Sequence, residues 1–222
     1  MKVRLSAWLL ALLGALLLLH TAWQKSPTWD EPGYFGLGAY LLQTGHWDVP
    51  ASCSHPPIAF YLHSLPVFFY PIDWSPWRYP QGKAGDLDFL RSADLRRGNA
   101  LLLNAGYAGE RLFFFCRATS LVFYGLLALA LYRWGCRLRR SQGGLLALGL
   151  LALCPNAMAH AALINTDFAF EAAFALAVCA FYLLLQAPSA LRLAGAAGGL
   201  GLALGSKLSA LVLLPGLGLG LA

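Results

Sequence analysis

Seven ionisable side chains in this 222-residue chain stand out because they lie inside long apolar segments or just beyond them. They are Asp30, Glu31, His55, Arg117, Asp167, Glu171 and Lys207. A carboxylate can accept a proton from a reacting hydroxyl group. A fixed cation can stabilise negative charge that develops in a low-dielectric site. If the fold gathers these groups, they suit a reaction that deprotonates one group while an anion leaves another.

The composition excludes an ordinary cytosolic globule. Hydrophobic residues make up 59% of the chain and charged residues 12%, whereas soluble domains are about 45–50% apolar and about 25% charged. The net charge of +6 can indicate nucleic-acid binding, but only if the basic residues cluster on a soluble face. The five cysteines form no Cys-x-x-Cys pair, so neither a zinc ribbon nor a disulfide framework is indicated.

Long apolar segments predict an all-α polytopic membrane protein, because ~18–20 apolar residues in a helix span a ~30 Å hydrocarbon core. The expected spans are approximately 5–23, 112–134, 143–164 and 168–186, followed by 191–221 as one long or two short spans. A secretory signal peptide is the alternative for the first segment, but no clear Ala-x-Ala-like cleavage site follows it. We therefore expect an uncleaved first helix, and a kink at Pro155 in the third.

The segment 24–111 has a different character and is expected to form one long outer loop. It contains most of the prolines and all but two of the acidic residues. Within it, Ile58–Ile72 is apolar but interrupted by Pro66 and Pro71. This stretch is too short to span and predicts a helix lying at the membrane interface. Residues 73–100 are polar and contain Gly and Pro, which predicts a surface loop.

The distribution of basic residues predicts the orientation. The N-terminus and the short connections carry seven Lys or Arg and no acid, namely Lys2, Arg4, Arg133, Arg137, Arg139, Arg140 and Arg192. The positive-inside rule places them in the cytoplasm and residues 24–111 outside. The basic excess is therefore a topology signal, and nucleic acid is not an expected partner. The Leu-, Ala- and Gly-rich spans favour a bacterial inner membrane, and in a eukaryote the same topology would place the outer loop in the ER lumen.

This topology brings the unusual charges to one level. Arg117 lies ~9 Å below the outer surface, and Lys207 lies ~24 Å from the cytoplasmic end of its segment, again near the outer face. Asp167 opens its span from outside, with Glu171 one turn deeper on the same face. A charge in hydrocarbon costs at least ~2.5–3.5 kcal/mol. Snorkelling could relieve each cation separately, but convergence of acids and bases favours a shared polar cavity.

Several short motifs occur in an order that resembles a known family. Asp-Glu-Pro at 30–32 precedes an aromatic, Gly-containing stretch at 34–40 and Ser-His-Pro-Pro at 54–57; Cys-Arg-Ala-Thr-Ser follows at 116–120, Cys-Pro-Asn-Ala-Met-Ala-His at 154–160, Asn-Thr-Asp at 165–167 and Gly-Ser-Lys-Leu at 205–208. The order resembles lipid-carrier-dependent glycosyltransferases with the GT-C fold, such as protein O-mannosyltransferases and the aminoarabinose transferase of lipid A. Alone, the Asp-Glu pair is typical of a helix N-cap and His-Pro-Pro of a turn.

The resemblance implies a GT-C-like helix bundle that transfers a sugar from a polyprenyl phosphate to a hydroxyl acceptor, with inversion, on the periplasmic or luminal face. Asp30 would be the general base, and Asp167 would position the acceptor or tune the base. The implied catalytic residues are Asp30, Glu31 and Asp167, the implied phosphate-binding residues are His55, Arg117 and Lys207, and Glu171 supports them. Membrane lipids and a protein, lipid or glycan acceptor are the expected partners.

Other hypotheses remain beside this one. Asp30, Glu31, Asp167 and His55 are suitable ligands for a divalent metal, although nothing in their spacing demands one. Such transferases are considerably longer, so the chain resembles their N-terminal part without the C-terminal half. Intramembrane charges also mark transport pathways, which makes a polytopic transporter the main alternative. A non-catalytic or truncated membrane subunit is the second.

Overall fold

The computed structural model describes residues 2–45, 55–69 and 107–219, and every regular element in these ranges is helical. The elements are α1 (Lys2–Gln24), α2 (Glu31–Thr44), α3 (Ile58–Ser64), η2 (Leu65–Phe69), α5 (Tyr107–Ala118), α6 (Ser120–Leu153), α7 (Pro155–Ala161), α8 (Asp167–Gln186), α9 (Ala190–Ser206), η4 (Leu208–Val212) and α10 (Leu213–Leu219). The all-α prediction is confirmed for this part of the chain. The polar loop expected over 73–100 lies outside the described residues.

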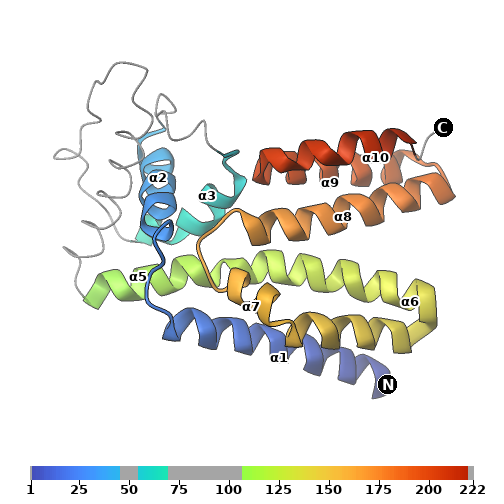
Figure 1. Cartoon of the computed structure of the whole chain (residues 1–222), viewed down its shortest axis with the longest axis horizontal. Coiled ribbons are helices and arrows are strands. Elements are labelled where there is room, and N and C mark those ends of the chain that lie inside the picture. The colour runs from blue at the N-terminus through green and yellow to red at the C-terminus, as the bar shows by residue number, and fades with distance from the viewer. Residues whose placement is uncertain (1, 46–54, 70–106, 220–222) are drawn as a thin grey trace.

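The long helices run side by side, with α6 between α1 and α8 and with α9 packed on α8 (Figure 1). Three stretches are long and apolar enough to cross a membrane by length and composition: Val3–Gln24, Glu110–Leu153 and Asp167–Gln186. Apolar side chains from neighbouring helices form the main core, including Leu18, Phe123, Leu127 and Phe168. Burial of these faces holds the helices together.

The α6 segment is two antiparallel arms rather than one rod. Arg139 (φ −140°, ψ 37°) and Arg140 (φ 50°, ψ −149°) leave the helical region, and the chain reverses there (Figure 1). Gly135 and Gly143 let the arms meet, because a Cβ on Gly135 would lie 2.4 Å from the Gly143 carbonyl oxygen. The two arms correspond to the spans expected over 112–134 and 143–164.

The second arm ends earlier than the expected span. Its helix stops at Leu153, Cys154 is extended (φ −77°, ψ 108°), and Pro155 begins the separate short helix α7. Proline lacks the N–H that would continue the ladder and restricts the residue before it. The break is therefore sharper than the expected kink.

The last apolar tract is also broken. The helix α9 ends at Ser206, and Lys207 is extended (φ −156°, ψ 137°) before η4 and α10. After the break, α10 runs back toward the end where α9 begins (Figure 1). The α9 helix has 17 residues, which is short for a complete crossing.

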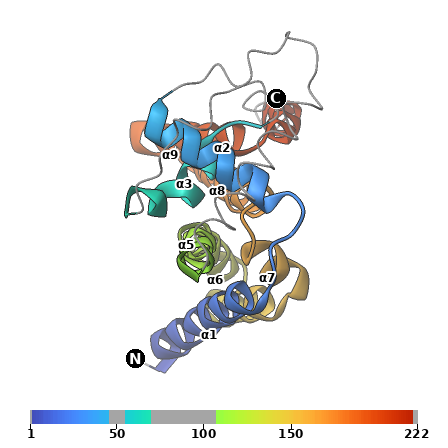
Figure 2. The same ribbon diagram turned by 90° about the vertical axis from the view of Figure 1, so that its left-hand side faces the viewer.

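The helices α2 and α3 lie across one end of the long helices (Figure 2). The interfacial helix expected over 58–72 corresponds here to α3 followed by η2. At the opposite end lie the start of α1, the turn at Arg139–Arg140 and the connection between α8 and α9 (Figure 1). The structure thus separates the basic connections from the segments that carry the candidate residues.

Candidate functional site

A buried ion pair joins α2 to α5 where α2 crosses the end of the bundle. The Arg117 and Glu31 side chains are 2% and 1% exposed, respectively. Nε of Arg117 donates to Oε1 of Glu31 at 2.8 Å, and Nη2 donates to Oε2 at 2.6 Å. This two-pronged geometry matches the planar guanidinium to the carboxylate. The two residues are 86 positions apart in sequence.

Arg117 also caps the C-terminal end of α1. Nη1 donates to the carbonyl oxygens of Ala22 (2.8 Å) and Lys25 (2.6 Å), and Nη2 donates to the Ser26 carbonyl (3.1 Å). The C-terminal carbonyls of a helix carry partial negative charge, which favours a cation there. Together with the two bonds to Glu31, all five guanidinium donors are used. Arg117 therefore has no free donor for the phosphate that the sequence assigns to it.

Glu31 is equally saturated. Oε1 accepts from the Ile164 backbone N–H at 2.8 Å, and Oε2 accepts from the backbone N–H (2.8 Å) and hydroxyl (3.1 Å) of Thr28. Thr28 is a part of this frame that was not predicted. The spacing Thr28-x-x-Glu31 resembles that of a capping box and could have identified it, although Asp30 and not Thr28 occupies the N-cap position of α2.

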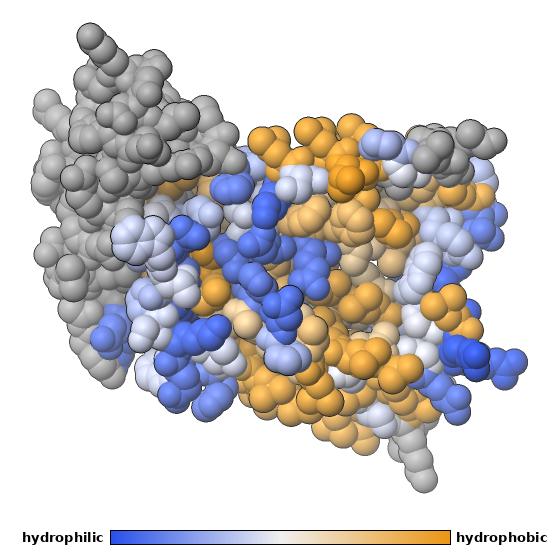
Figure 3. Space-filling model, in the orientation of Figure 1, coloured by the Kyte–Doolittle hydropathy of each residue, from blue (hydrophilic) through white to orange (hydrophobic). Residues whose placement is uncertain are grey.

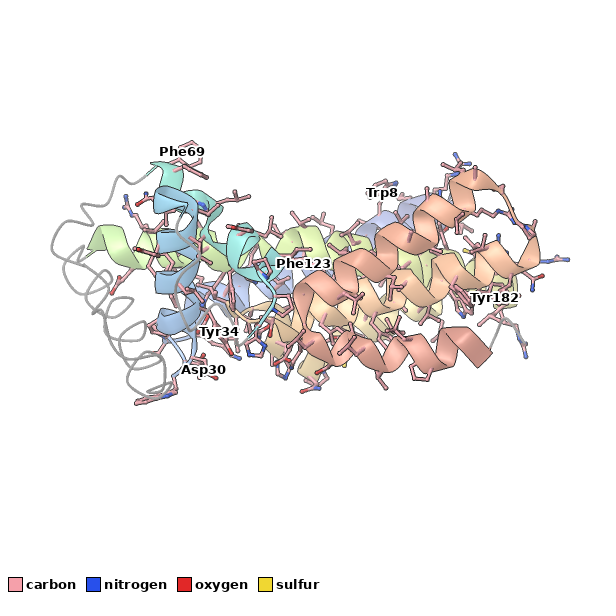
Figure 4. The ribbon with its side chains drawn as sticks, turned by 90° about the horizontal axis from the view of Figure 1, so that it is seen from above. Trp8, Asp30, Tyr34, Phe69, Phe123 and Tyr182 are labelled. Atoms are coloured by element: carbon pink, nitrogen blue, oxygen red, sulfur yellow. The ribbon has the colours of Figure 1, made fainter. Side chains whose placement is uncertain are left out.

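Asp30 occupies the N-cap position of α2, as the alternative for the Asp-Glu pair suggests, but its side chain makes no capping hydrogen bond. The residue is exposed. One turn later, Tyr34 donates its backbone N–H to the Asp30 carbonyl at 3.1 Å. Figure 4 labels Asp30 and Tyr34 at the same end of α2, beside the ends of the long helices. Asp30 thus combines an open carboxylate with a fixed backbone.

His55 lies against the same turn of α2. Its ring meets Tyr34 edge-on, with centroids 5.9 Å apart, and lies 6.4 Å from the Phe60 ring. Three residues further on, the Ile58 side chain packs on the α carbon of Gly205, where a Cβ would lie 2.3 Å from Cδ1. The His-Pro-Pro motif is therefore adjacent to the break in α9.

At that break, Lys207 forms an ion pair with Asp167 at the start of α8. The two side chains are 28% and 49% exposed, respectively. The Asn165 side-chain oxygen fixes the start of α8 by accepting the backbone N–H groups of Asp167 (3.1 Å) and Phe168 (3.2 Å). Unlike the Glu31–Arg117 pair, this pair remains open to solvent.

Glu171 stands apart from these contacts. It lies one turn after Asp167 on α8 and is exposed. The structure does not place it in contact with the two ion pairs, so the supporting role assigned to it stays a prediction.

His63 is a buried histidine that sequence analysis did not single out. It is 2% exposed, and its Nδ1 lies 3.1 Å from the Cys116 carbonyl oxygen and 3.0 Å from the Thr119 hydroxyl. Burial lowers the pKa of His63, and hydrogen bonds to the backbone of Cys116 and Asn165 and the charge of Glu31 partly oppose that effect. A neutral ring is therefore favoured here.

A groove of about 490 Å³ adjoins the other side of Arg117, between the end of α1 and α5. Its walls include Trp23, Lys25, Glu110 and Phe114. The Trp23 and Phe114 rings contact each other edge-on, with centroids 5.2 Å apart. The groove is thus amphipathic, with aromatic and charged groups side by side.

No group of three or more His, Cys, Asp or Glu side chains suitable for a metal ion occurs among residues 2–45, 55–69 and 107–219. Of the four ligands considered, Glu31 is already saturated by protein donors. The arrangement described here gives a divalent metal no prepared site.

Comparison with protein-family models, with curated proteins and with solved structures gave no match. The structure pairs Glu31 with Arg117 and Asp167 with Lys207 directly. It also places Asp30 and His55 beside the same residue, Tyr34.

Proposed function

We propose that the chain is a membrane glycosyltransferase that moves a sugar from a polyprenyl-phosphate donor to a hydroxyl acceptor. The proposal places the long apolar helices across the membrane as part of a GT-C-like bundle. The lipid tail of the donor would then lie in the bilayer, and its sugar would meet the polar end of the helices. Apolar side chains cover the middle of the molecule, and hydrophilic side chains gather beside α2 (Figure 3), which supports this arrangement.

One observation carries the proposal: the break in α9 sets the open Lys207–Asp167 pair at the end of the bundle that also bears the exposed carboxylate of Asp30. In the reaction, the acceptor oxygen bonds to the anomeric carbon while its proton passes to Asp30. The bond from the anomeric carbon to the phosphate oxygen breaks, and the phosphate keeps the electron pair. Lys207, with His55 nearby, stabilises that charge.

In this proposal Arg117 and Glu31 build the site without touching substrate. Each is at most 2% exposed, and each has its hydrogen-bonding capacity filled by protein groups. Of the three phosphate-binding residues that the resemblance implies, His55 and Lys207 therefore keep that role in the proposal and Arg117 does not. The catalytic role assigned to Glu31 becomes one of support for its neighbour, Asp30.

The test is sugar transfer by the full chain in liposomes supplied with a panel of polyprenyl-phosphate sugars and hydroxyl acceptors. We expect Asp30→Asn to lower kcat at least about 100-fold, since a positioned base contributes ~10²–10⁴. The control Glu110→Gln, which removes the charge of an exposed glutamate on α5, should leave transfer unchanged.

Lys207→Met should abolish transfer, and Lys207→Arg should retain part of it. Undiminished transfer by Asp30→Asn would remove Asp30 as the base, and no product with any donor would overturn the function.

A transporter is the second candidate, favoured by the unwound residues between α9 and η4 and between α6 and α7. Transporters bind substrates and ions where membrane helices are interrupted. Flux of labelled solute into sealed proteoliposomes, without a covalent product, would identify this function. Absence of both flux and transfer would favour a non-catalytic subunit.

A further inference from the structure

We infer that Glu31 and Arg117 are positioning residues that fix the separation of the two acidic segments at Asp30 and at Asp167. The inference rests on the proposed function for its catalytic meaning, but its geometric content can be tested without any substrate. The two segments are more than 130 residues apart in sequence. They are joined through the single carboxylate of Glu31.

The two oxygens of Glu31 hold different segments. Oε2 binds Thr28, two residues before Asp30, through both the backbone N–H and the hydroxyl. Oε1 binds the backbone N–H of Ile164, three residues before Asp167. Because these bonds involve backbone atoms close to each exposed acid, a change at Glu31 must shift the segments and not only their side chains.

Asn165 extends this control to Asp167. Its side-chain oxygen accepts the N–H groups of Asp167 and Phe168, and its side-chain nitrogen donates to the His160 carbonyl at 3.1 Å. The short link between α7 and α8 is thus held at both ends. A shift of Ile164 that follows a change at Glu31 would therefore also move the start of α8.

Arg117 stabilises the buried charge of Glu31 and makes the arrangement rigid. It neutralises Glu31 within a buried site, where an unpaired carboxylate would be costly. Its remaining donors tie Ala22, Lys25 and Ser26 to the same point. Lysine would keep the charge but has three donors on one nitrogen and cannot reproduce a planar five-donor fork. The inference therefore requires arginine itself.

The first experiment measures distance. Spin labels at Trp29→Cys and Glu171→Cys, in an otherwise cysteine-free chain, report the separation of the Asp30 and Asp167 segments, and both positions are exposed. We expect one narrow distance distribution in the parent. Glu31→Gln and Arg117→Lys should shift or broaden it, whereas the control Glu110→Gln should not. An unchanged distribution in both variants would overturn the inference.

The second experiment separates positioning from general stability. At a temperature where each variant keeps parental helix content by circular dichroism, Glu31→Gln and Arg117→Lys should lower kcat about 100-fold, as expected for a misplaced catalytic group. KM for the donor should stay unchanged, since Lys207 still binds it. A merely stabilising pair would leave kcat per folded molecule unchanged, which would contradict the inference. If the parent transfers no sugar, the proposed function fails while the distance measurement still decides the positioning.

Discussion

Solvent exposure separates the charged residues at this end of the bundle into two kinds. Glu31 and Arg117 are almost completely buried and satisfy each other, so removing either partner would strand the other at a cost of about 3–5 kcal/mol. Asp167 and Lys207 are paired but substantially exposed. Water screens the exposed pair, so its partners can be exchanged for a ligand at little cost. Under the proposed function, structural support and chemistry thus fall to different residues at this end of the bundle.

His63 should make stability depend on pH. Burial lowers its pKa in the folded protein, whereas the unfolded chain titrates near the ordinary value of about 6.5. The unfolded state therefore binds more protons between these two values, and stability falls as pH drops through about 6.5 toward the lowered folded pKa. Above this pH range, His63 should contribute no pH dependence to the stability of the folded protein.

The check is the thermal unfolding midpoint of the detergent-solubilised chain, measured from pH 8 down to pH 5. The parent midpoint should fall with pH more steeply than that of His63→Gln, which keeps a polar side chain without a titrating ring. Parallel curves for the two proteins would refute this role of His63. Comparison of the two slopes cancels the contributions of the other histidines.

At the level of elements, the position of Asp30 depends on how closely α2 packs on α3. Gly38 on α2 allows this, because a Cβ there would lie 2.6 Å from the Phe60 carbonyl oxygen and 2.2 Å from the Ser64 hydroxyl. Ser64 is itself buried and donates to the Phe35 carbonyl at 3.5 Å. The backbone contact cannot be relieved by a rotamer change, so a larger residue must separate the two helices.

We expect Gly38→Ala to destabilise the chain by about 1–3 kcal/mol, the usual cost of overpacking. The matched control is Gly149→Ala in the second arm of α6, where a Cβ meets nothing within 4 Å. That change should be neutral or stabilising by up to about 1 kcal/mol, because alanine is the better helix former. Denaturation monitored by circular dichroism measures both. Equal effects of the two substitutions would argue against close α2–α3 packing.

For the whole molecule, the arrangement of the ends is the principal feature. The start of α1, the turn at Arg139–Arg140 and the α8–α9 connection lie together at one end, and α2 and α3 lie at the other (Figure 1). At the basic end, Arg192 donates to the carbonyls of Leu183 (3.0 Å) and Ala187 (2.8 Å) and so caps the C-terminal end of α8. The location of the basic connections at one end suits the proposed membrane placement, with that end cytoplasmic.

Labelling with a membrane-impermeant maleimide tests this placement. In a cysteine-free background, Trp29→Cys should react in intact cells, and Gln142→Cys should react only after permeabilisation, since the two positions lie at opposite ends. The cysteine-free chain is the control for background. Labelling of both positions from one side would contradict a membrane between them, and the reverse pattern would contradict the orientation.

Much of the helical framework could be predicted from hydropathy alone. The expected spans 5–23 and 168–186 lie within α1 and α8, because uninterrupted apolar runs leave few alternatives to a helix. The expected spans 143–164 and 191–221 are interrupted in the structure. Pro155 gives a local reason for the first interruption. Lys207 is the local signal for the second, because a charged residue interrupts the apolar tract there, but its pairing with Asp167 depends on packing between α8 and α9.

The sequence by itself determined that the chain is helical and apolar, and which charged residues stand at the ends of its apolar segments. Hydropathy and charge are properties of single residues and short windows, so no tertiary contact is needed to recognise them. Only the tertiary structure decided that Arg117 joins Glu31 rather than facing a ligand, and that Lys207 joins Asp167 in the open. These pairings link segments 86 and 40 residues apart. Helix packing sets both the distances within the two pairs and the difference in their exposure.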